Sequence, residues 1–333
     1  MIRNGTGHLL FVALVLSSAT GAHAGPVGWR AAMSEAAPVR TRAVPVEIKA
    51  ERLHGIALKG AWALSGDHTQ FGGFSGLEVS EERLFAVTDF GWWFGAEMGL
   101  DDGLILRNAR VAPMRGPMGL PYSKAGGDAE DLVLSGDVLS VAFERDHRVM
   151  RLGTDGRLGA VIRVRAFERL RSNLGLEGLA AHPGGGLLAL TEASGDYLPV
   201  FRLGPGDVRD QISFHVPGRH QITGADLGPD GQLYVVRRKY SLIKGGSMQI
   251  VRYSIGDDGW PLAESAERLA FIGWYSGIDN MEGISVERGA DGVLRLWLIS
   301  DDNFSPLQRT LLVLFEIGAA ARPVAATGQG GSG

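Results

Sequence analysis

The chain of 333 residues contains no cysteine. Disulfide bonds therefore cannot stabilise the protein, and metal sites built from thiolates are excluded. Histidine is also scarce, with 8 residues that are not concentrated in the recurring motifs described below, which argues against zinc. A large hydrophobic core must therefore hold the fold together, and a chain of this length can bury one.

An excess of charge of either sign is also missing. The 33 Lys and Arg residues nearly balance the 37 Asp and Glu residues, for a formal net charge of -4. This composition provides neither the basic surface that binds nucleic acid nor a polybasic stretch for a membrane surface. We therefore expect no nucleic-acid partner.

Two common catalytic signatures are absent as well. The sequence has no Gly-x-Ser-x-Gly nucleophile elbow and no Walker-type phosphate loop. Ser75 and Ser285 lie within the recurring motifs, but no histidine partner is evident from the pattern. A Ser-His-Asp hydrolase therefore has weak support.

Long apolar runs are limited to the N-terminus. Residues 1–24 are typical of a secretory signal peptide, because Arg3 precedes an apolar run over residues 9–16 and Ala22-His23-Ala24 resembles a cleavage site. The run is too short for a permanent membrane span. We therefore expect the mature protein to be periplasmic or secreted.

The remaining chain divides into three parts by composition. Residues 25–45 lack periodicity and are expected to form a linker, and the Ala- and Gly-rich residues 319–333 are expected to form a disordered tail. Residues 46–318 form the folded domain.

The folded domain carries a short phrase that recurs about every 50 residues, a period typical of radial β repeats. This motif consists of an acidic residue with Leu or Ile, and usually Gly, near it in the sequence. Each copy is followed by an apolar run that ends in a charge. The acidic positions are Glu78, Glu130, Glu177, Asp226 and Glu282. The period predicts a β-propeller.

Short strands bounded by turn residues fill each repeat. Turn sequences such as Pro229-Asp230-Gly231 separate them, and there is room for four strands in each repeat. The sequence thus predicts an all-β propeller of five four-stranded blades, with a degenerate sixth from residues 44–64 and 110–127 as the alternative. Residues 56–64 precede the first full repeat and are expected to complete the last blade, which closes the ring and removes an unpaired edge.

The recurring carboxylates are the first candidate site. The innermost strand of each propeller blade lines a central channel, so a residue that recurs along that strand is expected to form a ring in space. A ring of like charges needs cations to balance it, and oxygen ligands of this kind favour calcium. The alternative is a structural ring whose carboxylates bond to backbone N–H groups of adjacent blades. The candidate metal ligands are Glu78, Glu130, Glu177, Asp226, Glu282 and Asp301.

Basic residues are the second candidate site. Arg237-Arg238-Lys239 follows the second strand of the fourth repeat, where the other repeats end in Asp or Glu. Arginine matches carboxylate and phosphate groups in a bidentate manner, so we expect an anion-binding edge to which Arg309, Lys244 and His220 also contribute. The alternative is that these cations only neutralise the carboxylate ring.

Several motifs together resemble one family. They are Phe74-Ser75-Gly76-Leu77-Glu78, Asp128-Ala129-Glu130, Gly175-Leu176-Glu177-Gly178-Leu179, Asp279-Asn280-Met281-Glu282-Gly283 and Leu298-Ile299-Ser300-Asp301-Asp302-Asn303-Phe304. Over about residues 50–318 the chain resembles the bacterial phytase-like domain family, also labelled "esterase-like activity of phytase". The resemblance implies an exported β-propeller related to calcium-dependent phytases, which hydrolyse phosphate monoesters. It also supports Glu78, Glu130, Glu177, Glu282 and Asp301 as pocket residues. The chain departs from the family pattern in the fourth repeat, at Asp226 and Arg237-Arg238.

These observations lead to one main hypothesis and two alternatives. The main hypothesis is a calcium-assisted hydrolase of a phosphate ester or another small anionic ester. Its catalytic carboxylates would be Glu282, Glu177 and Glu130, and its substrate-binding residues would be Arg237, Arg238, Lys239, Arg309 and Asn280. The first alternative is a non-catalytic propeller that binds a ligand or a partner in the cell envelope. The second is a lactonase-like propeller with one calcium ion in the channel. Substrate identity, turnover and oligomeric state have no sequence signal.

Overall fold

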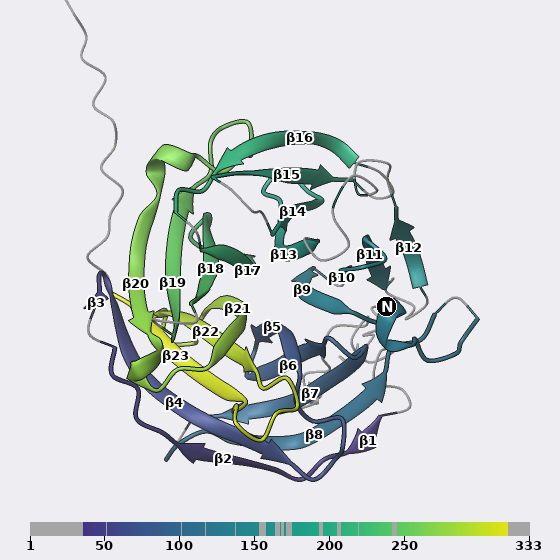
Figure 1. The fold of residues 1–333 in the computed structure, drawn as a ribbon, viewed down its shortest axis with the longest axis vertical. Helices are drawn as coiled ribbons and strands as arrows, with labels where there is room; N and C mark the ends of the chain where they lie inside the picture. The colour runs from purple at the N-terminus through teal and green to yellow at the C-terminus, as the bar shows by residue number, and fades with distance from the viewer. Residues whose placement is uncertain are drawn as a thin grey trace, which may run out of the picture.

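The computed structural model describes residues 36–50, 52–100, 102–116, 118–136, 138–152, 158–163, 167, 170, 175–192, 196–204, 208–218, 220–241 and 245–318. The expected signal peptide and the expected C-terminal tail lie outside these residues. The described chain is all-β and forms a five-bladed propeller around a central channel (Figure 1). The predicted fold class is thus confirmed, with five blades instead of six.

Four consecutive antiparallel strands, counted outward from the channel, build each of the first four blades. Blade 1 contains β5 (Phe74–Ser80), β6 (Arg83–Thr88), β7 (Trp92–Gly99) and β8 (Ile105–Pro113). Blade 2 contains β9 (Ala129–Ser135), β10 (Val138–Phe143), β11 (Arg148–Leu152) and β12 (Leu158–Ile162). Blade 3 contains β13 (Leu176–Ala181), β14 (Leu187–Thr191), β15 (Tyr197–Leu203) and β16 (Val208–His215). Blade 4 contains β17 (Gln221–Leu227), β18 (Gln232–Ser241), β19 (Gly245–Ser254) and β20 (Glu267–Gly273).

Blade 5 combines both ends of the folded domain. Its inner strands are β21 (Asn280–Arg288), β22 (Leu294–Asp301) and β23 (Leu311–Ile317), and β4 (Ile56–Gly66) pairs with β23 as the fourth strand. Short one-turn 3-10 helices, η1 (Lys124–Gly126), η3 (Ala263–Ser265) and η4 (Trp274–Ser276), lie in connections. The ring is therefore closed by an N-terminal strand, as predicted.

The N-terminal segment also adds outer strands to three blades. β1 (Ala37–Pro38) pairs with β8 of blade 1, β2 (Thr41–Pro45) with β4 of blade 5, and β3 (Arg52–Leu53) with β20 of blade 4. The expectation that residues 25–45 are all linker is therefore wrong for residues 37–38 and 41–45. The segment lacks periodicity because it forms edge strands, which do not need an apolar face.

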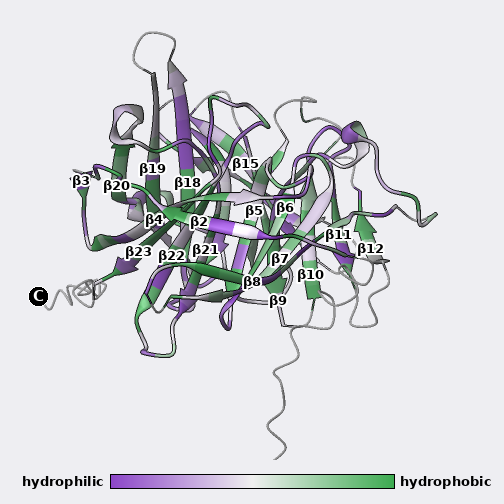
Figure 2. Ribbon diagram, turned by 90° about the horizontal axis from the view of Figure 1, so that it is seen from below, coloured by the Kyte–Doolittle hydropathy of each residue, from purple (hydrophilic) through white to green (hydrophobic). Residues whose placement is uncertain are grey.

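The hydrophobic core lies between neighbouring blades, so most central strands are buried on both faces. Leu84, Ala86 and Val87 on β6 and Leu296 and Leu298 on β22 are fully buried. Hydropathy colouring shows the same apolar bands along these strands (Figure 2). Strands buried on both faces read as continuous apolar runs, which explains why the second strand of each repeat is so clear in the sequence.

A β-bulge interrupts the innermost strand of every blade at the same level. One residue there has no partner on the second strand, and these residues are Ser75, Glu130, Glu177, Thr223 and Glu282. The following residue is glycine in four blades, because the innermost strands approach closely. A Cβ on Gly224 would lie 2.4 Å from the carbonyl oxygen of Glu282, and one on Gly283 would lie 2.8 Å from the backbone nitrogen of Leu77. The recurring acidic-Gly phrase is therefore a bulge that faces the channel.

Candidate active site at one mouth of the channel

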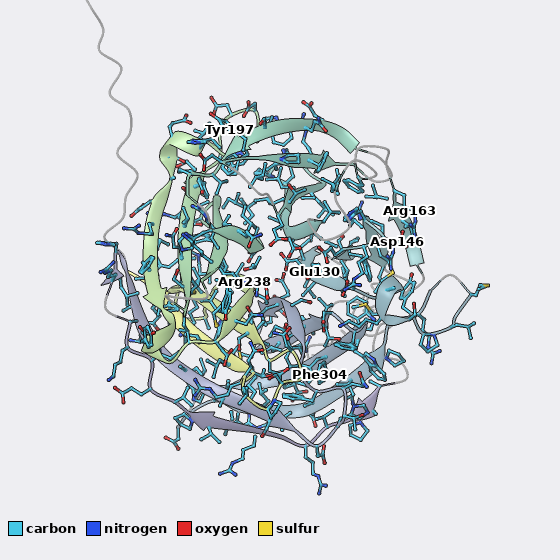
Figure 3. All side chains as sticks on the ribbon, in the orientation of Figure 1. Glu130, Asp146, Arg163, Tyr197, Arg238 and Phe304 are labelled. Carbon is cyan, nitrogen blue, oxygen red and sulfur yellow. The ribbon has the colours of Figure 1, made fainter. Side chains whose placement is uncertain are left out.

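Four of the five bulge residues lie on a cleft of about 780 Å³ at the channel end where the innermost strands begin. Ser75, Glu130, Glu177 and Glu282 line it. Glu130 and Arg238 both lie near the centre of the ring (Figure 3). β-Bulges often aim side chains at functional sites, and here the same device repeats around the channel.

The end of each second strand adds a second ring of side chains to this mouth. These residues stand opposite the first residues of the innermost strands, as the backbone pairing shows. They are Asp89, Glu144, Glu192, Arg238 and Asp301, all of which line the cleft. Four blades thus contribute a carboxylate, and blade 4 contributes a guanidinium. The charge reversal expected in the fourth repeat falls on Arg238.

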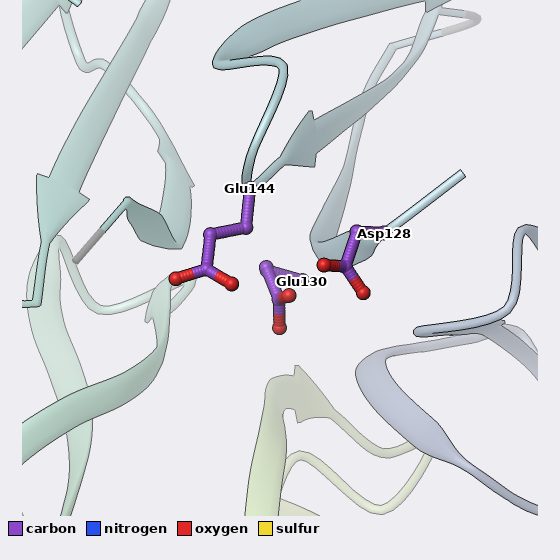
Figure 4. Close-up of side chains that lie close together, drawn as sticks. All are labelled: Asp128, Glu130 and Glu144. Carbon is purple, nitrogen blue, oxygen red and sulfur yellow. The ribbon is translucent and has the colours of Figure 1, made fainter. Parts of the chain in front are cut away.

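Five carboxylates gather on the wall formed by blades 2 and 3. The side-chain oxygens of Asp128, Glu130 and Glu144 lie within 4.8 Å of one another, and so do those of Glu144, Glu177 and Glu192. Figure 4 shows the first group, with Glu144 at the end of β10 directed towards Glu130. Glu144 belongs to both groups and therefore links the two blades.

Burial and mutual repulsion raise the pKa values of this wall. Burial, followed by the charge of Glu177, raises the pKa of Glu130 well above its usual range. Burial, followed by the charge of Glu192, does the same to Glu177. Burial raises the pKa of Glu144 to about 7. Such shifts mark groups that are poised to bind a cation or a proton.

The donor set of this wall fits calcium. All five groups are carboxylates, and calcium takes six to eight oxygen ligands from carboxylates, carbonyls and water. A bound cation would also relieve the repulsion that raises the pKa values of Glu130 and Glu177. Arg145 already forms an ion pair with Asp128 at the edge of the group.

A hydrogen-bonded trio stands on the side of the cleft formed by blades 4 and 5. Arg238 Nη1 lies 2.8 Å from Glu282 Oε1, and Asn280 Nδ2 donates to the same oxygen over 2.8 Å. Arg238 also donates to Asn280 Oδ1. Burial raises the pKa of Glu282 to about 8, although Arg238 opposes the rise. Arg238 is therefore held in place by two side chains of β21 and directed at the cleft.

Two predicted ligands do not reach this mouth. Glu78 and Asp226 lie three residues beyond the bulges of their strands and line a separate cleft at the opposite channel end. Leu134 N donates to Glu78 Oε2 over 3.1 Å, and Val286 N donates to Asp226 Oδ2 over 2.6 Å. The expectation of one ring of five carboxylates is thus wrong for these two. They connect adjacent blades, as in the structural alternative.

Their places at the mouth are taken by hydroxyl side chains. Ser75 Oγ donates to the carbonyl oxygen of Ala129 over 2.5 Å, and Thr223 Oγ1 donates to that of Met281 over 3.1 Å. Both hydroxyls are used to connect neighbouring blades. Only Glu130, Glu177 and Glu282 of the five predicted acidic positions therefore lie in the cleft.

The predicted substrate-binding residues separate into two groups. Arg238, Lys239 and Asn280 line the cleft. Arg237 is buried behind it and donates to the carbonyl oxygen of Pro217 over 2.6 Å. Arg309, which is not among the residues lining the cleft, donates to the carbonyl oxygen of Gly277 over 2.8 Å. Arg237 and Arg309 therefore do not belong to the site. Arg237 faces away from the cleft because successive side chains of a strand point to opposite faces. Arg309 instead bonds to a nearby loop.

Of two further predicted contributors, His220 is not among the residues that line the cleft. His220 is hydrogen-bonded to Ser247 Oγ over 3.1 Å, and burial lowers its pKa to about 4. Lys244 lies outside the described residues. By contrast, Asp301 lines the cleft as predicted, and burial raises its pKa to about 7.

Sequence reasoning missed three carboxylates that matter for this architecture. Glu144 and Glu192 were visible only as the charges that end apolar runs. Asp131, directly after Glu130, is fully buried and accepts backbone N–H groups of Leu132 (2.9 Å), Leu179 (2.8 Å) and Ala225 (3.2 Å). It thus connects blades 2, 3 and 4 within the ring of innermost strands. Burial raises its pKa well above the usual range despite these three donors.

No helix among the described residues has the length and apolar character needed to cross a membrane.

Comparison with solved structures gives similarity of shape at low identity. Glutaminyl cyclase from Myxococcus xanthus is 13% identical with a TM-score of 0.46, and the match covers 84% of this chain and 99% of that chain. The PQQ-bound form of aldose sugar dehydrogenase from Streptomyces coelicolor is 12% identical with a TM-score of 0.39, covering 84% and 99%. Neither likeness bears on the chemistry of this chain. A search of curated proteins found no match.

The comparison with family models gives a specific result. Residues 69–304 match the Phytase-like model, whose description is "esterase-like activity of phytase". The match covers more than half of the chain, including all five bulges and both rings of the cleft. The chain belongs to the Phytase-like family.

Proposed function

We propose that this protein is a calcium-assisted hydrolase of a small anionic ester, foremost a phosphate ester, and that the cleft at the channel mouth is its active site. One observation carries the proposal. Two carboxylate clusters, which have Glu144 in common, lie in the same cleft as Arg238. A purely structural ring would have each carboxylate bonded to a neighbouring blade, as Glu78 and Asp226 are.

The residues that would hold calcium are Asp128, Glu130, Glu144, Glu177 and Glu192. They supply oxygen donors only, within distances that one ion or two ions can bridge. When bound, calcium would neutralise charge on the scissile group and lower the pKa of an attacking water. Glu130 and Glu177 keep their proposed place in the site as ligands.

Arg238 would bind an anionic oxygen of the substrate. A guanidinium offers a fork of donors that matches phosphate or carboxylate, and Glu282 and Asn280 fix its orientation. A cation that is already oriented stabilises charge that develops in the transition state. Lys239, the next residue on β18, adds a second positive charge at the rim.

Glu282 would donate a proton to the leaving oxygen of the ester and take one back from the attacking water. Its pKa of about 8 lies close to neutral pH, where a group is most effective as a general acid or base. Oε1 already accepts hydrogen bonds from Asn280 and is paired with Arg238. The proton is therefore assigned to Oε2, the other oxygen of this carboxylate.

Calcium titration of EDTA-treated protein tests the proposal. We expect calcium to bind, and to support hydrolysis of p-nitrophenyl phosphate, in the protein and in Glu78→Gln, the matched control at the opposite channel end. Glu144→Gln, which removes the shared carboxylate, should abolish both. Absence of calcium binding would contradict the proposal. Binding without turnover of phosphate esters or lactones would favour the binding-propeller alternative, and turnover of lactones alone would favour the lactonase alternative.

The proposal also includes export of the protein from the cytoplasm. The signal-peptide pattern of residues 1–24 supports a periplasmic or secreted location. Calcium is more available there than in the cytosol, where proteins must compete for it at low concentration.

A further inference from the structure

The two sides of the cleft differ in chemical character. The carboxylates described above cover the side of blades 2 and 3. The side of blades 4 and 5 carries Arg238 and Lys239 and also presents apolar side chains, which are Tyr240, Met248, Ile278, Met281 and Leu307. Asp279, the other acidic residue on this side besides Glu282 and Asp301, accepts hydrogen bonds from Asn280 N, Gln308 Nε2 and Arg309 N.

Two of these apolar side chains are open to solvent. Tyr240 is 65% exposed and Leu307 is 92% exposed. Exposure of this degree means that neither side chain contributes much to the core. Exposed apolar groups that lie beside a concave polar site often contact the ligand.

Tyr240 is placed at the cleft by an extended hairpin. β18 and β19 contain 10 residues each, and their hairpin extends beyond the neighbouring strands (Figure 2). Tyr240 pairs across the hairpin with Gly246, which has no side chain to crowd the ring. Both residues line the cleft. The length of this hairpin therefore gives the cleft an aromatic side.

The position of Tyr240 relative to Arg238 gives the arrangement a direction. Residues two apart on a strand face the same side, so both side chains stand over the cleft, one at the charged centre and one further out. Leu307 enters from the loop between β22 and β23, where Ser305 Oγ accepts a hydrogen bond from its backbone nitrogen over 3.3 Å. A ligand whose anionic group sits at Arg238 would thus place its organic part against Tyr240 and Leu307.

The charges of the cleft disfavour a ligand with several anionic groups. Lys124 is paired with Asp89, Arg145 with Asp128 and Arg238 with Glu282, and the cations that line the apolar side are Arg238 and Lys239. One bound calcium ion would offset only two of the five carboxylate charges on blades 2 and 3, so a second or third phosphate group would still lie against like charge.

We infer that the cleft selects an ester with a single anionic group and an apolar, preferably aromatic, organic part, and that Tyr240 and Leu307 determine this specificity. The inference rests on the proposed function, because it takes Arg238 and the calcium held by the carboxylate wall as the place of the anionic group. It goes further in naming the substrate class and in assigning contacts to two residues that lie outside the recurring motifs.

Binding of non-hydrolysable phosphonates tests this inference without depending on turnover. Phenylphosphonate and methylphosphonate carry the same anionic group and differ only in their apolar part. In calorimetry with calcium present, we expect phenylphosphonate to bind about tenfold more tightly than methylphosphonate, and more tightly than fructose 1,6-bisphosphate. The double variant Tyr240→Ser, Leu307→Ser should lose the preference for the phenyl group and keep its affinity for methylphosphonate. Tyr275→Ser, which changes a tyrosine that is 88% exposed and does not line the cleft, is the matched control.

The outcomes separate this inference from the proposed function. Equal affinities for the two phosphonates, tighter binding of the bisphosphate, or an equal loss of both phosphonates in the double variant would overturn the specificity and leave the anion site intact. Failure of all three ligands to bind protein that does bind calcium would overturn both. Because both substituted residues are exposed, the variants are expected to fold, and an unchanged melting temperature checks this.

Discussion

Without divalent cations, the stability of the protein should fall as the pH rises. Glu282 is the clearest case, because its pKa is about 8 in the folded protein against an ordinary value of 4.5. Between these values the unfolded chain has released the proton while the folded protein still holds it. Stability is therefore fully retained below about pH 4.5, declines through this window, and reaches its lower level above about pH 8.

The magnitude follows from the same two values. Each pKa unit corresponds to about 1.4 kcal/mol, so the rise for Glu282 sets an upper bound of about 5 kcal/mol. Glu282 is only 7% exposed, so solvent screening reduces this figure little. Relaxation of the cleft lowers this figure, and we expect Glu282 alone to account for a loss of about 2–5 kcal/mol in the free energy of unfolding between about pH 5 and about pH 9.

Urea unfolding followed by tryptophan fluorescence measures this loss. In EDTA, the midpoint should fall steadily with pH, and Glu282→Gln should show a smaller decline because it removes one titrating group. Asp301 and Glu144, with pKa values of about 7, contribute to the remaining decline together with the other carboxyl groups whose pKa values burial raises, such as Glu130 and Glu177. Added calcium should restore stability at high pH. A midpoint that stays constant or rises between about pH 5 and about pH 9 in EDTA would refute the reasoning.

Three further predictions concern the central ring and the anion site. Gly224→Ala should destabilise the protein by at least about 1–3 kcal/mol, because its Cβ would lie 2.4 Å from a carbonyl oxygen of the next blade, whereas Gly273→Ala, with nothing within 4 Å, should leave the melting temperature unchanged. Asp131→Ala should cost about 3–5 kcal/mol in urea unfolding, since three buried N–H groups lose their acceptor, and Asp131→Asn should cost less because its amide oxygen still accepts. Arg238→Lys should weaken methylphosphonate binding about tenfold in calorimetry, while Arg309→Lys should not, and equal effects would place the anion elsewhere.

The fold could be predicted because its signals are local and repeat. The second strands are buried on both faces and therefore appear as apolar runs, and turn residues separate them at regular intervals. The pairing of residues 56–64 with the last blade followed from the need to close the ring. The outer strands β1, β2 and β3 could not be predicted, because edge strands of two to five residues carry no periodic pattern.

The candidate site was predicted only in part, because the acidic residue of each motif is not always the bulge residue. Glu130, Glu177 and Glu282 are bulge residues, whereas Glu78 and Asp226 stand three residues later, and a shift of this size moves a side chain to the other end of the channel. Comparison of the glycines would have aligned the repeats correctly, since Gly76 and Gly224 follow Ser75 and Thr223. Glu144 and Glu192 could not be predicted as site residues. They directly follow the second strands of their blades, and only the tertiary pairing of strands brings them close to the bulge residues.

The attachment of residues 37–66 to blades 1, 4 and 5 has a consequence for how the chain folds. These strands are made first, yet their partners β8, β20 and β23 follow much later in the sequence, and β23 ends at Ile317. β2 can pair with β4 early, whereas β3 and β4 cannot pair with β20 and β23 until almost all of the domain has been synthesised. The same segment supplies strands to three of the five blades. Its loss would therefore destabilise blades 1, 4 and 5 at the same time.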